Sequence, residues 1–168
     1  MENKNYIGKI IMSNRNFQKI LDFYLFRCPT PGKSARAKTF EQLGWKGSHQ
    51  FAQLKRRLMN AATINLNKNY HPCKKDELGA EYKKISHIDS TDEYCIFLKY
   101  DDKTIMQSLF SAIRNALAHG SFSIKSYKKE HLYTFDNIDG YKKAEIVLRE
   151  KTLLEWIKIL EQGYQPNT

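Results

Sequence analysis

Residues 104–124 place the strongest limit on how this chain can fold. They read TIMQSLFSAIRNALAHGSFSI and carry one formal charge, Arg114, although 27% of all residues in the chain are charged. The apolar residues recur with helical spacing, which predicts a helix over roughly 103–119. Because a helix without Lys or Glu has no face suited to water, we expect other parts of the protein to cover it. Arg114 and His119 then need polar partners there.

The charge of the whole chain is strongly positive. The net charge is +10 and the isoelectric point is near 9.4. Such an excess favours a polyanion as partner, although a generic basic surface would give the same numbers. Basic residues also occur in pairs, and our candidates for contacts with a polyanion are Arg56, Arg57, Lys128 and Lys129.

The cysteines and the apolar runs exclude several classes of protein. Cys28, Cys73 and Cys95 are odd in number and widely spaced, and no CxxC occurs. We therefore expect no disulfide framework and no metal site, and a reducing cytoplasm fits best. No P-loop, GxGxxG, HExxH or GxSxG motif occurs, so we also expect no cofactor. No run approaches the roughly eighteen apolar residues of a membrane span, so we expect no membrane partner. Asn14 and Arg15 interrupt any apolar core of a secretory signal.

The pattern along the chain predicts one mainly α domain over 1–168. A helical bundle is expected over about 13–119, a small antiparallel β element over about 121–148, and a closing helix over about 150–162. Within the bundle, helices are expected at 13–28, 35–43, 49–67 and 103–119, with a short one near 76–85. The run 94–100 suits either a strand or a helical turn. Asp101 and Asp102 are candidate N-caps for the central helix, and Asp139-Gly140 signals a hairpin turn.

The central helix has two different arcs on a helical wheel. Large apolar side chains fill one arc, which we expect to face the core of the protomer. Small neutral residues occupy the opposite arc, including Ser108, Ser111 and Ala118. Small side chains allow close approach, so these three are our candidates for the interface of a two-fold homodimer. A second helix of the same protomer would cover the arc equally well.

Polar residues gather at the end of this helix. Asn115 and His119 are four residues apart and share a face. His119 stands at the carboxyl end just before Gly120, where the helix dipole favours a protonated ring. A His tuned near neutrality can give or take a proton at working pH. An Arg can hold phosphate oxygens as charge builds on them.

These residues carry a family resemblance. RNALAH, from Arg114 to His119, resembles the Arg–x4–His signature of HEPN domains, with Asn directly after the Arg and Gly after the His. The predicted helices with a β-rich segment behind them are similar to a small plasmid- and defence-associated HEPN branch. The motif covers six residues, and the architecture covers most of the chain. A toxin subgroup of the family has Tyr two residues after the His, where Ser121 stands here, so silencing by modification at that position is not expected.

The resemblance implies a helical dimer that cleaves RNA without a metal ion. In that reaction the RNA 2′-hydroxyl attacks its own phosphate and leaves a 2′,3′-cyclic phosphate and a 5′-hydroxyl. Arg114 would stabilise the phosphate, His119 would move the proton, and Asn115 would orient His119 or the phosphate. The expected setting is phage defence or a toxin–antitoxin system, with an antitoxin or regulatory protein as a further partner. The alternatives are a non-catalytic HEPN module that binds RNA or a protein as a dimer, and a purely structural dimer.

Overall fold

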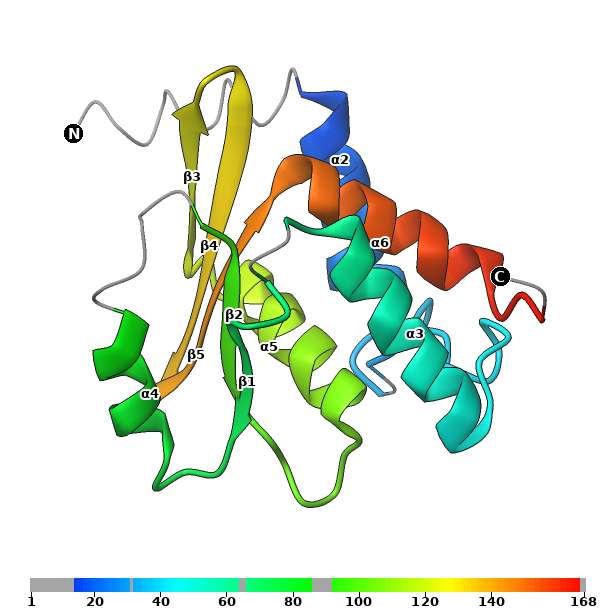
Figure 1. Cartoon of the computed structure of the whole chain (residues 1–168). Helices are drawn as coiled ribbons and strands as arrows, with labels where there is room; N and C mark the ends of the chain where they lie inside the picture. The colour runs from blue at the N-terminus through cyan, green and yellow to red at the C-terminus, as the bar shows by residue number, and fades with distance from the viewer. Residues whose placement is uncertain (1–13, 31, 64–65, 86–91, 167–168) are drawn as a thin grey trace.

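A five-stranded sheet with helices on both faces forms the centre of the protein. The computed structural model describes residues 14–30, 32–63, 66–85 and 92–166. Helices α2, η1, α3, α5 and α6 cover one face of the sheet and α4 covers the other (Figure 1). The helices are α2 (Arg15–Leu21), the π-helical η1 (Asp22–Arg27), α3 (Gly47–Ala61), α4 (Leu78–Ile85), α5 (Ile105–Ala118) and α6 (Glu150–Gln162). The strands are β1 (Tyr70–Cys73), β2 (Tyr94–Leu98), β3 (Phe122–Tyr127), β4 (Glu130–Asp139) and β5 (Tyr141–Arg149).

The sheet is mixed, with strand order β1-β2-β5-β4-β3. β1 and β2 are parallel, with Tyr70 opposite Cys95. All other pairs are antiparallel, and β2 pairs with β5 so that Tyr94 lies opposite Val147. The prediction of a mainly α fold is therefore wrong. The β element at 121–148 is present, but it continues into β2 and β1, which lie inside the interval predicted to be a helical bundle.

The two missed strands have a physical explanation. β2 lies between β1 and β5 and is buried on both faces, so its run of apolar residues shows no alternation that would separate a strand from a helical turn. β1 is short and contains Pro72. An edge strand tolerates a proline because one side of it has no ladder bond to make. The predicted helix at 35–43 is also absent, since these residues form turns.

Specific caps fix both ends of α5. Thr104, and not Asp101 or Asp102, is the N-cap, and it forms a capping box with Gln107. At the other end Gly120 has a φ of 66°. The Ser121 N–H donates to the Ala116 carbonyl at 2.8 Å and the Gly120 N–H donates to Leu117 at 3.2 Å, which is a Schellman motif. The helix therefore ends at a fixed place, directly before β3.

Aromatic side chains with polar atoms join the helices to one another. The Tyr24 hydroxyl donates to the Leu153 carbonyl at 2.8 Å, which links η1 to α6. Trp156 Nε1 donates to the Leu58 carbonyl at 2.8 Å, and Trp45 Nε1 donates to the Leu160 carbonyl at 3.2 Å. Since both indoles are fully buried, these bonds satisfy donors that would otherwise be costly. The helical side is thus a specific packed layer.

We expect Gly163→Ala to destabilise the protein. Gly163 ends α6 with φ 70° and ψ −170°, a conformation that is essentially restricted to glycine. A Cβ built there would lie 2.7 Å from the Leu43 carbonyl oxygen. The free energy of unfolding should fall by about 1–3 kcal/mol, measured by urea unfolding. Gly32→Ala is the control, because its φ is 78° but nothing lies within 4 Å of its Cβ position. An equal loss in both variants would show that the contact with Leu43 does not matter.

Candidate functional site

His119 is placed at the surface by the end of α5. It is the C-cap residue, and its backbone N–H donates to the Asn115 carbonyl at 3.0 Å. Its side chain is exposed, although the helix before it is largely buried. The ring therefore stands at a fixed backbone position with solvent access, as a group that exchanges protons with a ligand requires.

Arg114 lies one turn earlier and contacts Asn115. Its Nη1 donates to Asn115 Oδ1 at 3.3 Å. Nε of the same side chain is buried and has no hydrogen-bond partner. The positive charge of Arg114 also acts to lower the pKa of Cys28, the C-cap residue of η1. Within the described ranges Arg114 forms no salt bridge, so its charge is not neutralised by a carboxylate.

A hollow of about 320 Å³ opens beside His119. It lies where the end of α5 meets the hairpin between β4 and β5, and α5 packs against β4 directly. Asn115 and His119 both line it, whereas Arg114 does not and reaches it only through its bond to Asn115. The other lining residues are Tyr100, Asn137, Ile138, Asp139 and Lys143.

The hollow contains an ion pair next to the His. Lys143 Nζ donates to Asp139 Oδ2 at 2.7 Å. This hydrogen bond and the charge of Lys143 hold the pKa of Asp139 below its ordinary value, and His119 adds a smaller effect in the same direction. The bond to Asp139 also raises the pKa of Lys143. Burial raises the pKa of Tyr100. At neutral pH the hollow therefore holds an ammonium, a carboxylate and a neutral phenol beside the imidazole.

Sequence reasoning identified Arg114, Asn115 and His119 but missed four polar residues of the hollow: Tyr100, Asn137, Asp139 and Lys143. Asp139 was recognised as the start of a hairpin turn, and that turn is present between β4 and β5. No local pattern shows that this turn lies beside the end of α5. The alternation in β4 and β5 could have suggested that Asn137 points inward, because it continues the buried series of Tyr133 and Phe135.

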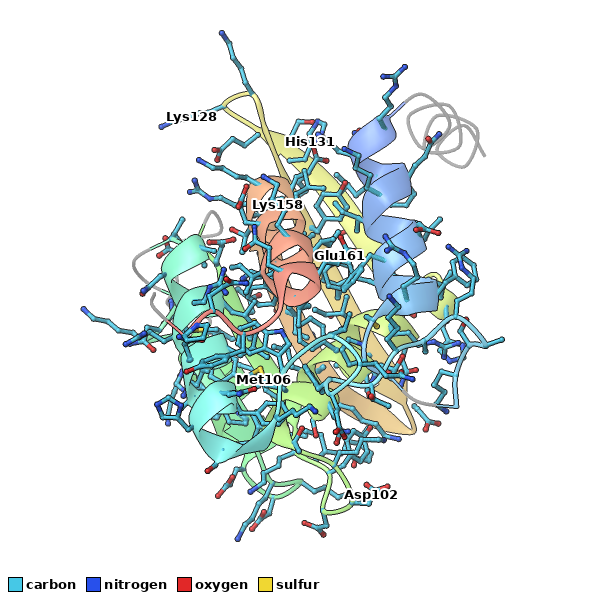
Figure 2. All side chains as sticks on the ribbon, turned by 90° about the vertical axis from the view of Figure 1, so that its right-hand side faces the viewer. Asp102, Met106, Lys128, His131, Lys158 and Glu161 are labelled. Carbon is cyan, nitrogen blue, oxygen red and sulfur yellow. The ribbon has the colours of Figure 1, made fainter. Side chains whose placement is uncertain are left out.

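The predicted RNA-binding lysines lie far from His119. Lys128 and Lys129 form the two-residue turn between β3 and β4, with φ of 45° and 68°. β3 begins shortly after His119 and ends at this turn, and at about 3.3 Å per residue its length separates the two places by roughly 20 Å. Figure 2 shows Lys128 at the tip of the hairpin.

The predicted RNA-binding arginines lie on α3. Arg56 is exposed and lines a different hollow, together with Lys55 and Asn67. Arg57 is engaged within the protein. It donates to the Gly163 carbonyl at 3.3 Å and to Gln162 Oε1 at 2.9 Å, and its guanidinium lies over the Trp45 ring. The structure therefore does not bring these basic pairs together with His119.

The three residues predicted to form a dimer interface differ in exposure. Ser108 is fully buried, and its Oγ accepts a hydrogen bond from the Tyr100 backbone N–H at 3.2 Å. Ser111 is also buried. Ala118 is exposed at the end of the helix. Because Ser108 and Ser111 are buried in the single chain, part of the small-residue arc is covered from within one protomer.

The thiol of Cys28 should make the protein less stable in alkali. Burial raises its pKa from 9.0 to about 12, although Thr30 and Arg114 oppose the shift. The unfolded chain loses this proton near pH 9, whereas the folded chain keeps it, so the free energy of unfolding falls as the pH rises from about 9 to 12. One such group contributes about 1.4 kcal/mol per pH unit.

Urea unfolding of the wild type and of Cys28→Ala between pH 8 and 11 measures this contribution. The variant should lose stability with a shallower slope above pH 9, whatever its stability at pH 8. The remaining slope should come from other buried groups, such as the thiol of Cys95, whose pKa burial also raises. Parallel pH dependences of the two proteins would contradict the assignment to Cys28.

Comparison with known protein families, with curated proteins and with solved structures gave no match to this chain. In the described ranges, no helix has both the length and the apolar character needed to span a membrane. The same residues contain no group of three or more His, Cys, Asp or Glu side chains arranged to hold a metal ion. What the protein does must therefore be inferred from the side chains around the hollow and from its surface charge.

Proposed function

We propose that this protein is a metal-independent endoribonuclease that acts through Arg114, Asn115 and His119. One observation carries the proposal: Asn115 accepts a hydrogen bond from the Arg114 guanidinium and lines the same hollow as His119. The three residues of the Arg–x4–His pattern thus form one connected group at the surface. The proposal rests on this group and on the positive charge of the chain, and not on a helical-bundle fold, which the five-stranded sheet excludes.

The chemistry needs a proton acceptor, a phosphate contact and a proton donor. His119 takes the proton of the RNA 2′-hydroxyl, the 2′-oxygen bonds to phosphorus, and the bond from phosphorus to the 5′-oxygen breaks. Arg114 stabilises the charge on the phosphate oxygens, oriented by Asn115. Lys143 is protonated at neutral pH and lies in the same hollow, so it can return a proton to the 5′-oxygen. The products are a 2′,3′-cyclic phosphate and a 5′-hydroxyl.

The proposal includes partners. A homodimer would use the exposed end of α5 around Ala118, so that a second chain completes the surroundings of His119. RNA is the substrate, and an antitoxin or other regulatory protein would restrain the nuclease in the cytoplasm. These partners follow from the resemblance of RNALAH to HEPN nucleases and from the net charge of +10.

Incubation of the purified protein with a labelled single-stranded RNA in EDTA tests the proposal. Cleavage should persist in the chelator, and the products should carry a 2′,3′-cyclic phosphate. Arg114→Ala should abolish the cleavage, while Arg36→Ala, which removes an exposed arginine paired with Asp22, should not. Cleavage that stops in EDTA and returns with a divalent cation would reject the metal-independent mechanism.

A non-catalytic RNA-binding module is the second candidate, and one observation favours it. Arg114 lies outside the lining of the hollow and its Nε is buried, as expected for an arginine with a structural role. In that case the same assay would show binding that weakens steeply with salt but no cleavage.

A further inference from the structure

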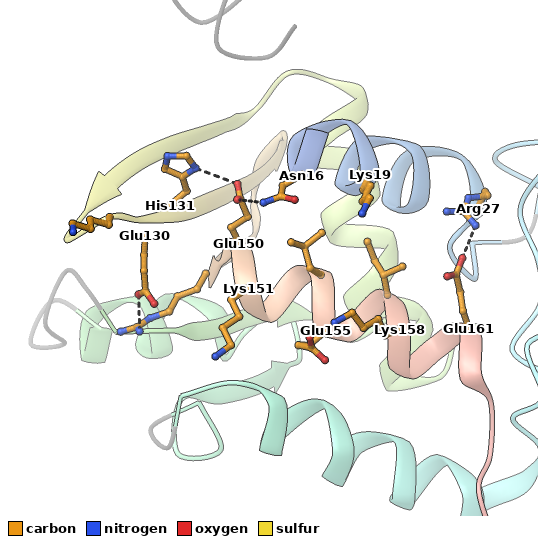
Figure 3. Close-up of a pocket in the computed structure, with 14 residues that line it drawn as sticks. Asn16, Lys19, Arg27, Glu130, His131, Glu150, Lys151, Glu155, Lys158 and Glu161 are labelled. Atoms are coloured by element: carbon orange, nitrogen blue, oxygen red, sulfur yellow. Dashed lines mark hydrogen bonds and ion pairs between the residues drawn. The ribbon is translucent and has the colours of Figure 1, made fainter. Parts of the chain in front are cut away.

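A concave site larger than the hollow beside His119 lies among the helices that cover one face of the sheet. It is a groove of about 630 Å³ between α2 and α6, closed at one end by the β3–β4 hairpin (Figure 3). Leu154 and Ile157 supply apolar surface from α6, and charged side chains stand around them. His131, Lys158 and Glu161 mark its course along this side of the molecule (Figure 2). The groove does not include Arg114 or His119.

The charges in the groove do not cancel. Three cations that line it are paired with glutamates: Arg27 with Glu161 at 2.5 Å, Arg149 with Glu130 at 2.8 Å, and Lys158 with Glu155 at 2.5 Å. Lys19, Lys129 and Lys151 line the same groove and form no ion pair within the described part of the chain. They come from α2, from the hairpin turn and from the first turn of α6. Three separate elements thus direct unneutralised ammonium groups at one concave surface.

The fourth glutamate of the groove is held in a separate network. Glu150 accepts hydrogen bonds from Asn16 Nδ2 at 2.8 Å and from the Tyr133 hydroxyl at 2.7 Å. His131 Nδ1 lies 3.2 Å from Glu150 Oε2. Partial burial acts to raise the pKa of Glu150, but the hydrogen bonds from Asn16, Tyr133 and His131 outweigh it, so the pKa lies below its ordinary value.

This network fixes the ring of His131. A carboxylate at Nδ1 sets the orientation of an imidazole and leaves Nε2 for a ligand. Because Glu150 is already bonded to Asn16 and Tyr133, it is a fixed anchor rather than a free negative charge. The groove therefore offers three ammonium groups that have no ion pair among the described residues, and one oriented imidazole, beside an apolar floor.

We propose that this groove binds the phosphate group of a nucleoside phosphate, either a free nucleotide or one unit of a nucleic acid strand. The lysines contact the phosphate oxygens, and the imidazolium form of His131, which carries a proton on both nitrogens, donates a hydrogen bond from Nε2. Leu154 and Ile157 give the base an apolar surface to lie on. The proposal is independent of cleavage at His119, because the groove shares no residue with the hollow at the end of α5.

Fluorescence anisotropy with a labelled twelve-nucleotide single-stranded DNA tests the groove, since DNA lacks the 2′-hydroxyl that the proposed cleavage needs. The variant with Lys19→Ala, Lys129→Ala and Lys151→Ala should bind at least about tenfold more weakly. The slope of log affinity against log salt should become smaller by about 2, since each lost phosphate contact on a single strand contributes roughly 0.7. His131→Asn should weaken binding less than the triple variant does.

Lys125→Ala is the matched control. Lys125 is an exposed lysine on the same hairpin, and it lies opposite Leu132 in the register, on the face of the sheet away from His131. It should change the affinity less than twofold. A triple variant that binds the DNA as the Lys125→Ala protein does would overturn the proposal, as would a wild-type protein that binds neither the DNA nor a mononucleotide.

The source of the phosphate is found with two further probes. Uridine 3′-monophosphate and inorganic phosphate are titrated by calorimetry into the wild type and the triple variant. Binding of the mononucleotide that the triple variant loses identifies a free-nucleotide site. Binding of the DNA alone, lost in the same variant, identifies a strand site. RNA cleavage that fails while these titrations succeed rejects the nuclease and leaves the groove.

Discussion

Replacing His119 with alanine should lower the rate of RNA cleavage by about 10²–10⁴-fold, the usual contribution of a general acid or base. The expected effect follows from the position of His119 in the hollow. His119 is the imidazole that lines the hollow next to Asn115, and no other histidine in the described part of the chain lines it. Its side chain is exposed, so the substitution removes little packing and should leave the fold intact. Cleavage is measured with a labelled RNA at fixed protein concentration, and thermal unfolding checks the fold.

His49→Ala is the control for this effect. His49 is exposed on α3, where its ring lies against Tyr164, and it is not among the residues that line the hollow. It should retain cleavage within about twofold, because it is outside the machinery that moves the proton. Full activity of the His119→Ala protein would refute the proposed role of the imidazole. Equal losses in both variants would point to a general effect of removing a histidine.

Replacing Glu93 with alanine should cause a large loss of stability. Glu93 is fully buried. Its Oε2 accepts the Thr63 N–H at 2.7 Å and its Oε1 accepts the Arg149 N–H at 2.8 Å. Arg149 is the N-cap of α6 and Thr63 follows α3, so one carboxylate joins the beginning of one helix to the segment after another.

The expected loss is about 2–6 kcal/mol in the free energy of unfolding, since two backbone donors lose their acceptor at about 1–3 kcal/mol each. Urea unfolding at pH 7 measures it. Glu93→Gln should lose less, because the amide oxygen keeps one of the two bonds. Glu41→Ala, which breaks an exposed ion pair with Lys46, should change stability by no more than about 0.5 kcal/mol. A change at Glu93 no larger than that at Glu41 would be inconsistent with the buried contact.

The elements with a clear local signal were predicted well. α6 occupies Glu150–Gln162, as its apolar stripe indicated, and β4 and β5 meet at the Asp139-Gly140 turn. The fold class was wrong because it depends on long-range pairing. β2 is an apolar run that suits a helix or a strand, and only its position between β1 and β5 decides between them. β1 has too few residues to show any period.

The candidate site also contains residues that a local pattern relates and residues that only the fold brings together. Arg114, Asn115 and His119 are close in sequence, so a helical spacing could relate them. Lys143 and Tyr100 reach His119 only because α5 packs across β4 beside the hairpin, and no local pattern encodes that packing. The groove at His131 was missed because its partners Asn16 and Glu150 are 134 residues apart.

The two residues at the hairpin tip, Lys128 and Lys129, adopt an unfavourable backbone conformation. Both residues adopt left-handed backbone angles, which cost a residue with a side chain roughly 1–2 kcal/mol relative to glycine. Asparagine and glycine are the residues that such a turn favours. The chain instead has two lysines at positions where the backbone conformation is unfavourable for a residue with a side chain. Local folding preference therefore does not explain these lysines, whereas the proposed phosphate site gives an electrostatic role to Lys129, which lines the groove.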